Sequence, residues 1–249
     1  MSAKVRDLIK CLDEIAPFSL CEEWDNVGLI VGDPDAEAEC VLCALDLNEA
    51  VINEAIACKA DVIVAHHPIL FRGTKRICED KVEGRLIRKL IKNDISFIAM
   101  HTNFDNASPG VNDALAQKLG LINVTAIGNG MRIGEVAGTS FDAFAGHVRD
   151  VLGGPVRCYE PENGIIKKVA VLGGAGEDYI PEAIENGADV FITGEVSYHK
   201  ALDAVALGMG IIEAGHRETE RPGVNLLCRG LQNALDAVQY NIRVFESKI

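Results

Sequence analysis

The sequence has little positive charge. Its 24 Lys and Arg residues stand against 37 Asp and Glu residues, so the formal net charge is −13 at pH 7. Proteins that hold nucleic acid through its phosphates need a basic stripe that displaces counterions. The charge balance therefore argues against a nucleic-acid partner, and it is compatible with a cation-binding site.

Long apolar runs are also absent from the sequence. None approaches the ~18 consecutive apolar residues of a membrane-spanning helix. Near the N-terminus, charged residues interrupt an apolar pattern with helical spacing, where a signal peptide would need an unbroken apolar core: Val5, Leu8, Ile9, Leu12 and Ile15. We therefore expect a soluble, cytoplasmic protein without a membrane partner.

Closely spaced cysteines occur only once. The eight cysteines are scattered through apolar segments, and the one close pair, Cys40 and Cys43, lies in an expected strand, where residues three apart face opposite sides. A redox pair needs an exposed helix N-terminus to lower its thiol pKa. We interpret the cysteines as reduced core residues, with a redox or zinc role for this pair as the alternative.

Aromatic residues make up only 5% of the chain, and Trp24 is the only tryptophan. It lies in an acidic segment just before the strand-like residues 27–30. Trp24 either lines a pocket or packs against this first strand, and packing is the preferred interpretation. Its acidic neighbours, Glu22, Glu23 and Asp25, are expected to be solvated or to support metal ligands rather than to bind a metal themselves.

The chain does contain a repeat. Residues 54–67 include Glu-Ala-Ile followed by Ala-Asp-Val-Ile-Val-Ala-His-His, and residues 182–195 include Glu-Ala-Ile followed by Ala-Asp-Val-Phe-Ile-Thr-Gly-Glu, at an offset of 128. A second echo relates residues 101–112 to residues 216–225. We expect two related lobes, 1–127 and 128–249, with the Gly-containing segment 127–135 as their seam and the C-terminal segment packing back on the first lobe.

Apolar runs of strand length alternate with segments of helical period. The expected strands are 41–45, 62–65, 95–100, 169–172, 190–193 and 210–214, and the expected helices are 49–58, 82–91, 181–186 and 198–206. Continuous apolar strands separated by helices indicate a mostly parallel sheet covered on both faces. The predicted fold class is therefore α/β, with two related α/β/α lobes from an internal duplication.

Metal-ligand residue types follow the ends of these strands. Ligands bind beyond the carboxyl ends of parallel strands, which is where the chain carries His66, His67, His101, Asp105, Glu195, His216 and Glu220. Imidazole nitrogen and carboxylate oxygen without sulfur suit Zn²⁺, Mn²⁺, Fe²⁺, Co²⁺ or Ni²⁺ better than Mg²⁺ or Ca²⁺. The alternative for His66 and His67 is a strand end whose imidazoles bond to backbone or solvent. The repeat favours the metal site.

Three further features leave alternatives open. The loop Gly173–Gly176 follows a strand and either cradles a phosphate with its amides or is a purely steric turn. Arg217 and Arg221 either meet an anionic substrate or form surface ion pairs. His147, in the helical segment 141–151, is expected to be structural or exposed.

Five segments resemble the NIF3-like family of GTP cyclohydrolase 1 type 2 homologs, also called dinuclear metal centre proteins. They are residues 23–29, 65–68, 101–105, 193–195 and 215–223, and the resemblance covers essentially the whole chain. It implies a NIF3-like fold, a dinuclear metal site in the inter-lobe cleft and a ring-shaped homohexamer. The ligands that it implies are His66, His67, Asp105, His216 and Glu220, with Glu220 as a bridging carboxylate and His101 beside the metals.

The chain departs from the family pattern in two places. It is similar to the short form, without a mid-sequence insertion. It also carries Tyr198 and His199 where many members have two histidines, so a proton-shuttle role at position 198 does not carry over, while His199 remains available.

Two divalent transition-metal ions at this site would acidify a bound water and stabilise an oxyanion. We therefore expect a metal-dependent hydrolase acting on a small anionic, nucleotide-like substrate, with His101 and Glu195 moving protons. The alternative is a non-catalytic metal-binding regulator, insertase or chaperone that acts through protein partners. The residue pattern names neither the substrate nor the metal.

Overall fold

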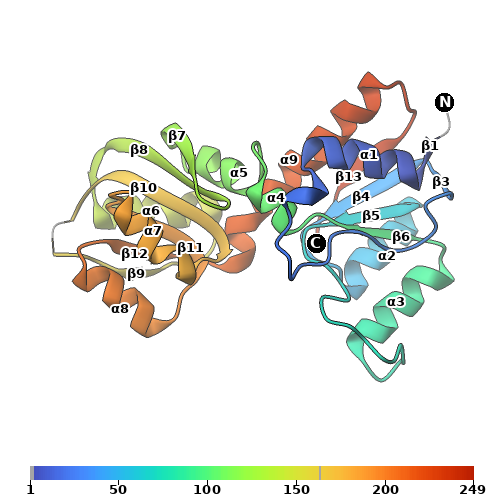
Figure 1. The fold of residues 1–249 in the computed structure, drawn as a ribbon, viewed down its shortest axis with the longest axis horizontal. Helices are drawn as coiled ribbons and strands as arrows, with labels where there is room; N and C mark the ends of the chain where they lie inside the picture. The colour runs from blue at the N-terminus through green and yellow to red at the C-terminus, as the bar shows by residue number, and fades with distance from the viewer. Residues whose placement is uncertain (1–2, 163) are drawn as a thin grey trace. The chain divides into compact units, whose positions relative to one another are not determined.

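The computed structural model of the protein describes residues 3–162 and 164–249. The chain divides into two compact units. The first comprises the residues up to Ser108 together with Val224–Ile249, and the second comprises Pro109–Gly223. Both have the α/β architecture that the sequence predicts, with helices packed on a central sheet (Figure 1).

The first unit is built on a five-stranded sheet. Its strand order is β13 (Arg243–Glu246), β4 (Cys40–Ala44), β5 (Val62–Ala65), β6 (Ser96–Ala99) and β2 (Gly28–Val31). The first four strands run parallel, and β2 pairs with β6 antiparallel. Ala44, Ala65 and Ala99 lie opposite one another, so β4, β5 and β6 end at the same edge.

Helices cover this sheet on both faces, with α1 (Val5–Ile15) on one face and α2 (Glu49–Cys58) and α3 (Val82–Lys92) on the other (Figure 1). Alternate strand residues such as Leu42, Ile63 and Phe97 join the core beneath α2 and α3. Asn48 caps α2, because its side chain accepts a hydrogen bond from the Val51 amide at 2.9 Å. The remaining elements are β1 (Ala3–Lys4), β3 (Glu37–Ala38), the 3₁₀ turn η1 (Phe18–Leu20) and α4 (Thr102–Asn106).

The second unit has a six-stranded sheet. Its strand order is β7 (Ile122–Ile127), β8 (Met131–Ser140), β10 (Ile165–Ala175), β11 (Val190–Glu195), β12 (Gly210–Glu213) and β9 (Arg157–Tyr159). Only β10, β11 and β12 are parallel, so the prediction of a mostly parallel sheet is correct for the first unit and wrong here. The expected seam is a hairpin turn, in which Gly128 and Gly130 have φ of 48° and 85° and lead β7 into antiparallel β8.

Helices also cover both faces of the second sheet. Val169 and Val171 of β10 pack in the core with α5 (Val111–Lys118) and α6 (Phe141–Leu152). Ala170 and Leu172 face the opposite core, with α7 (Ile180–Glu185) and α8 (Tyr198–Ala206). This alternation is what a strand buried on both faces requires. The last elements are the 3₁₀ turn η2 (Glu177–Tyr179) and the start of α9 (His216–Ala237), which continues into the first unit after Gly223.

The first lobe was expected to end at residue 127 and to receive the C-terminal segment, and the units differ from this expectation only in the boundary. Residues 109–127 lie in the second unit, where β7 pairs with β8. Residues 224–249 lie in the first unit, where β13 pairs with β4. The strand pairing, rather than the order along the chain, therefore decides which residues make up each unit.

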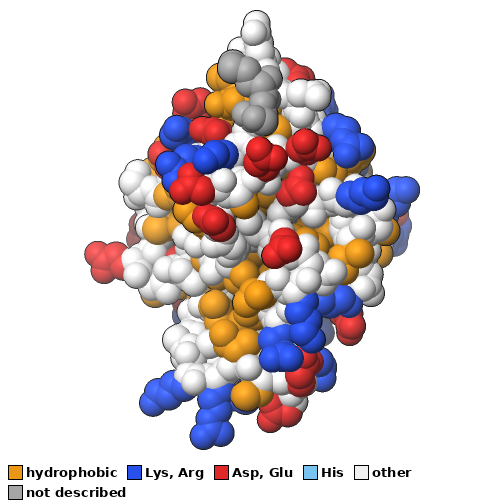
Figure 2. Space-filling model, turned by 90° about the vertical axis from the view of Figure 1, so that its right-hand side faces the viewer, with side chains coloured by type: hydrophobic (Ala, Val, Ile, Leu, Met, Phe, Trp, Pro, Cys, Tyr) orange, Lys and Arg blue, Asp and Glu red, His pale blue; other side chains and the backbone are white. Residues whose placement is uncertain are grey.

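The surface mixes charges of both signs. Figure 2 shows one face on which Lys and Arg side chains lie among Asp and Glu side chains around a strip of apolar side chains. Among the helices of residues 3–162 and 164–249, none combines the length and the apolar character of a membrane span. The cysteines are all free, and Cys78 and Cys158 are exposed, so the expectation of core cysteines is wrong for these two.

Candidate metal centre

Three histidines of the first unit follow the carboxyl ends of its parallel strands. His66 and His67 come directly after β5, and His101 follows β6 and leads into α4, which carries Asp105. Because β5 and β6 end at the same edge, the three imidazoles meet there. The strand ends before His66, which lets two adjacent residues point to one place.

Each of these imidazoles has its Nδ1 against an oxygen acceptor. His66 Nδ1 lies 2.8 Å from the Met100 carbonyl oxygen. His67 Nδ1 lies 2.8 Å from Asp46 Oδ1, and His101 Nδ1 lies 2.9 Å from Asp25 Oδ1. Carbonyl and carboxylate oxygens accept hydrogen bonds, so Nδ1 carries the proton on each ring and Nε2 keeps its lone pair. This is the arrangement that metal-binding histidines use.

The donor atoms of this group converge. One ring nitrogen from each of His66, His67 and His101 lies within 4.8 Å of the others. Asp105 Oδ1 lies 3.6 Å from His66 Nε2, and only 2% of His66 is exposed. Three imidazoles and a carboxylate in a largely buried position form the nitrogen-rich set that suits a divalent transition metal.

Asp25 holds His101 in place. Its carboxylate is fully buried and binds the Thr102 amide and hydroxyl in addition to His101. Burial raises the pKa of Asp25, but the hydrogen bonds from His101 and Thr102 outweigh burial and bring that pKa to about 2. Asp25 is therefore ionised at neutral pH and fixes the Nδ1 tautomer of His101.

The second unit carries its own imidazole and carboxylate cluster. His216 begins α9, and Glu195 is the last residue of β11. His216 Nδ1 lies 3.2 Å from Glu195 Oε1, and His216 Nε2 lies 3.2 Å from Glu220 Oε1 one helical turn later. Glu220 is buried, whereas the Glu195 side chain is 61% exposed. A buried carboxylate against an imidazole offers oxygen and nitrogen to a cation.

Glycines make room for this second cluster. A Cβ on Gly174 would lie 2.4 Å from Glu220 Oε1, and a Cβ on Gly194 would lie 2.6 Å from the His216 Cα. Gly174 also has a φ of 68°, which favours glycine. Position 194 therefore requires glycine, because β11 approaches the His216 backbone too closely for a Cβ.

The amides of the loop Gly173–Gly176 are used inside the unit. Those of Gly173, Gly174 and Gly176 donate to Asn112 Oδ1, Thr219 Oγ1 and Thr193 Oγ1, at 2.7, 3.1 and 2.9 Å. The hypothesis that they cradle a phosphate is wrong, because their hydrogen bonds already go to side chains. The steric interpretation of the loop holds, since its glycines border Glu220 and His216.

The whole chain matches one family. The sequence profile of the family described as Duf34/NIF3 (NGG1p interacting factor 3) matches residues 3–249. The chain belongs to the Duf34/NIF3 family. The resemblance seen in its motifs is thereby confirmed.

Named relatives of this NIF3 family member span its full length. A GTP cyclohydrolase 1 type 2 homolog of Clostridium acetobutylicum is 34% identical over 259 residues, which cover 100% of this chain and 97% of the relative. A crystal structure of a Staphylococcus aureus hypothetical protein has a TM-score of 0.95 at 34% identity, covering 99% of this chain and 96% of that one. A Bacillus cereus protein related to NIF3 has a TM-score of 0.94 at 28% identity, with 99% and 97% covered.

Some NIF3 residues lie where the sequence did not lead us to expect them. Trp24 is 60% exposed and contacts the edge of His101, so the interpretation that it packs the first strand is wrong. Asp46 was missed as the support of His67, although it follows an apolar strand in the same way as the histidines do. Asp25 supports His101, as expected for a residue that assists a ligand.

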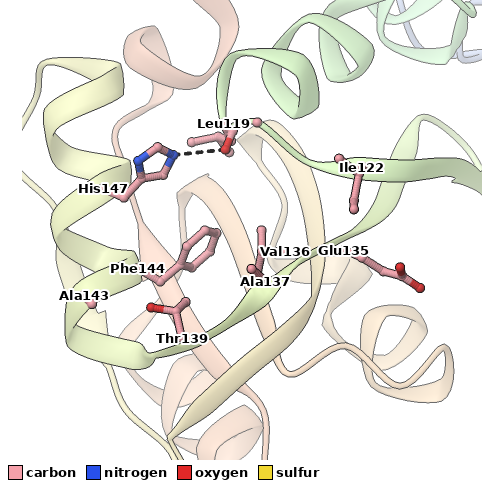
Figure 3. Close-up of a pocket in the computed structure, with 10 residues that line it drawn as sticks. Leu119, Ile122, Glu135, Val136, Ala137, Thr139, Ala143, Phe144 and His147 are labelled. Carbon is pink, nitrogen blue, oxygen red and sulfur yellow. Dashed lines mark hydrogen bonds between the residues drawn. The ribbon is translucent and has the colours of Figure 1, made fainter.

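Other polar residues named from the sequence are exposed to solvent. Tyr198 and His199 begin α8 and are exposed, as are Arg217 and Arg221, whose roles stay predictions. His147 of α6 donates from Nε2 to the Leu119 carbonyl at 3.0 Å, as expected for a structural residue. It lines a pocket of about 450 Å³ under α6, together with Phe144, Val136 and Thr139 (Figure 3).

Proposed function

We propose that this protein binds two divalent transition-metal ions and hydrolyses a nucleotide-like substrate with them. The ligands in this proposal are His66, His67, Asp105, His216 and Glu220. The observation that carries it is the common orientation of the first-unit histidines, each of which donates a hydrogen bond from Nδ1 to an oxygen and keeps the Nε2 lone pair for a metal. The family relatives named GTP cyclohydrolase 1 type 2 homolog support the substrate class.

The chain's own residues have distinct roles in this proposal. Bound ions of this kind lower the pKa of a coordinated water and stabilise negative charge on the attacked group. In this proposal the Nε2 atom of His101 takes up the proton that the water loses. The buried Asp25 carboxylate stabilises the resulting imidazolium through Nδ1. Glu195 orients His216 by accepting a hydrogen bond from its Nδ1, and this exposed carboxylate is the second candidate for proton transfer.

The strand orders support a common origin of the two units. In the first unit β4, β5 and β6 are parallel and β2 adds antiparallel to β6. In the second, β10, β11 and β12 are parallel and β9 adds antiparallel to β12. We propose that an internal duplication produced both sheets. We also propose that the protein is a cytoplasmic, ring-shaped homohexamer. Light scattering of the purified protein measures the mass of the assembly.

The decisive experiment measures metal per chain by plasma mass spectrometry, followed by a nucleotide turnover screen of the same samples. The samples are the wild type, a His66→Ala/Asp105→Ala variant, a His216→Ala/Glu220→Ala variant and the control His147→Ala. We expect about two ions per chain in the wild type and the control, and a loss in each double variant. Turnover should follow the metal and fall further in His101→Ala.

Three results would change the proposal. Metal retained in both double variants would return these residues to hydrogen bonding at strand ends. Metal lost in only one of them would confine the ions to that unit. A full metal content with no turnover of any nucleotide would favour the metal-binding regulator, insertase or chaperone over the hydrolase.

A further inference from the structure

Two large aromatic rings stand exposed beside His101. Trp24 is 60% exposed and Phe71 is 43% exposed. Their ring centroids lie 5.6 Å apart in an edge-to-face arrangement, and they lie 6.2 and 6.1 Å from the His101 ring. Both rings therefore border the imidazole that adjoins His66 and His67.

Hydrogen bonds of neighbouring residues hold the two segments that carry these rings. Trp24 directly precedes Asp25, whose buried carboxylate is bound to His101 and Thr102. Asn26 Nδ2 donates to the Leu70 carbonyl at 3.0 Å, which ties the Trp24 segment to the Phe71 segment. Two segments far apart in the sequence thus present their aromatic side chains together, on supports that also fix His101.

Burial does not explain this arrangement. Single exposed apolar residues are common, but adjacent exposed aromatic rings beside a polar cluster are typical of ligand sites. A tryptophan or phenylalanine that is held rigid offers a flat, polarisable face at low entropic cost. Such a face stacks on any nucleobase, because every base has a π-face. A flat heteroaromatic ring presents the π-face that this kind of stacking uses.

We propose that Trp24 and Phe71 form the stacking wall for the planar ring of the substrate that reacts beside His101. The ligand class is a nucleobase-like heteroaromatic ring attached to a polar group. This inference rests on the proposed function, because it assigns the ring of the nucleotide-like substrate to the wall and its reacting group to the histidine cluster.

Trp24 makes the test direct, since it is the only tryptophan and its fluorescence reports on the wall alone. The metal-loaded protein is titrated with the four common ribonucleoside 5′-monophosphates and with ribose 5-phosphate, which lacks the ring. We expect at least one nucleotide to quench the fluorescence and ribose 5-phosphate to leave it unchanged.

Variants locate the effect. Phe71→Leu should weaken the binding of the quenching nucleotide by about 10-fold or more, and Trp24→Leu, followed by calorimetry, by about 10- to 100-fold. Phe245→Leu is the matched control, because Phe245 is 42% exposed on β13 of the same unit and is not part of the wall. Its affinity should equal that of the wild type.

Several outcomes would overturn the wall. They are equal quenching by ribose 5-phosphate, no quenching by any nucleotide, and an unchanged affinity in both wall variants. If light scattering shows that Trp24→Leu forms a smaller assembly while its nucleotide affinity is unchanged, Trp24 and Phe71 belong to an interface between copies of the chain. Turnover and metal content separate the two proposals. Ring-dependent quenching without turnover would contradict the hydrolase alone. Bound metal without quenching would contradict the wall alone.

Discussion

The two units place different residues at the same point of three neighbouring parallel strands, β4, β5 and β6 in the first unit and β10, β11 and β12 in the second. His66 and His67 follow β5 in the first unit, and Gly194 and Glu195 are the corresponding residues of β11, at the offset of 128. In the first unit position 66 has room for a buried imidazole. In the second, the His216 backbone takes that room, so only glycine fits. The two segments therefore agree in where they end a strand, while local packing decides whether that position holds an imidazole or a glycine.

The clusters also differ in how their imidazoles are oriented. His66, His67 and His101 are each oriented by an acceptor from elsewhere in the chain: Met100, Asp46 and Asp25. His216 instead lies between two carboxylates, one of them one turn along its own helix. The first cluster is thus rich in nitrogen and depends on separate supports, whereas the second is rich in oxygen and depends on close backbone packing.

The largest effect should come from breaking the packing that distinguishes the second cluster. Gly194→Ala would place a Cβ 2.6 Å from the Gly174 carbonyl oxygen and the His216 Cα, both backbone atoms. We expect a loss of about 3 kcal/mol of unfolding free energy and a fall in melting temperature of roughly 6–12 °C. Calorimetry of the purified variant measures both.

The matched control for this change is Gly146→Ala in α6. A Cβ there would meet no atom closer than Arg149 Nη2 at 4.0 Å, so the helix should gain roughly 0.5–1 kcal/mol. Equal melting temperatures for Gly194→Ala and the wild type would show that β11 has more freedom than its contacts suggest.

The next effect tests the supports that distinguish the first cluster. Asp46→Ala should weaken metal affinity by about 10- to 100-fold, because the imidazole of the proposed ligand His67 loses its support. Asp25→Ala should lower metal affinity less, because Asp25 supports His101, which is not among the proposed ligands. Competition with a coloured chelator measures the affinities, and the exposed Asp150→Ala is the control. The reverse order would make His101 a metal ligand.

Lowering the pH should show how much the ionised Asp25 stabilises the metal-free protein. The pKa of Asp25 is lowered in the folded state to about 2 from its ordinary 3.8. Its ionised form therefore contributes stability above about pH 4, and this contribution is lost as the pH falls through about 2. We expect the difference in unfolding free energy between the metal-free wild type and Asp25→Asn to shrink from pH 5 to pH 2.5. Urea titrations that give a constant difference would contradict the assignment.

The smallest effect should come from the histidine that belongs to neither cluster. His147→Ala removes one hydrogen bond to the Leu119 carbonyl, worth at most about 1 kcal/mol at an exposed position. Metal content should not change. A loss of metal in this variant would mean that the histidine clusters respond to damage anywhere in the second unit.

Much of the fold followed from the sequence because its central elements have strong patterns. The helices Glu49–Cys58 and Tyr198–Ala206 and the strand Val62–Ala65 lie where their periodicity predicts them. The antiparallel strands β7, β8 and β9 were not predicted. Their exposure pattern is irregular, and their pairing depends on partners distant in the chain, which a local pattern does not encode.

The site was predictable in kind but not in detail. Strand ends marked His66, His67, His101 and His216 as candidates, and these residues do form clusters within their units. The tautomers and the support by the Met100 carbonyl were beyond the sequence, because a backbone oxygen carries no residue signature. The exposed position of Trp24 was also missed, since an aromatic residue before a strand is usually buried.

The parallel pairing of β13 with β4 sets an order for folding during synthesis. Residues 109–223 form one unbroken stretch, so the whole second unit is synthesised before residue 243. The first sheet, in contrast, keeps the β4 edge open until Arg243–Glu246 arrive. An open strand edge is a template for pairing with other chains. The nascent chain therefore carries an unpaired β4 edge throughout the translation of its second unit. During that interval a chaperone that covers this edge would prevent pairing with other chains.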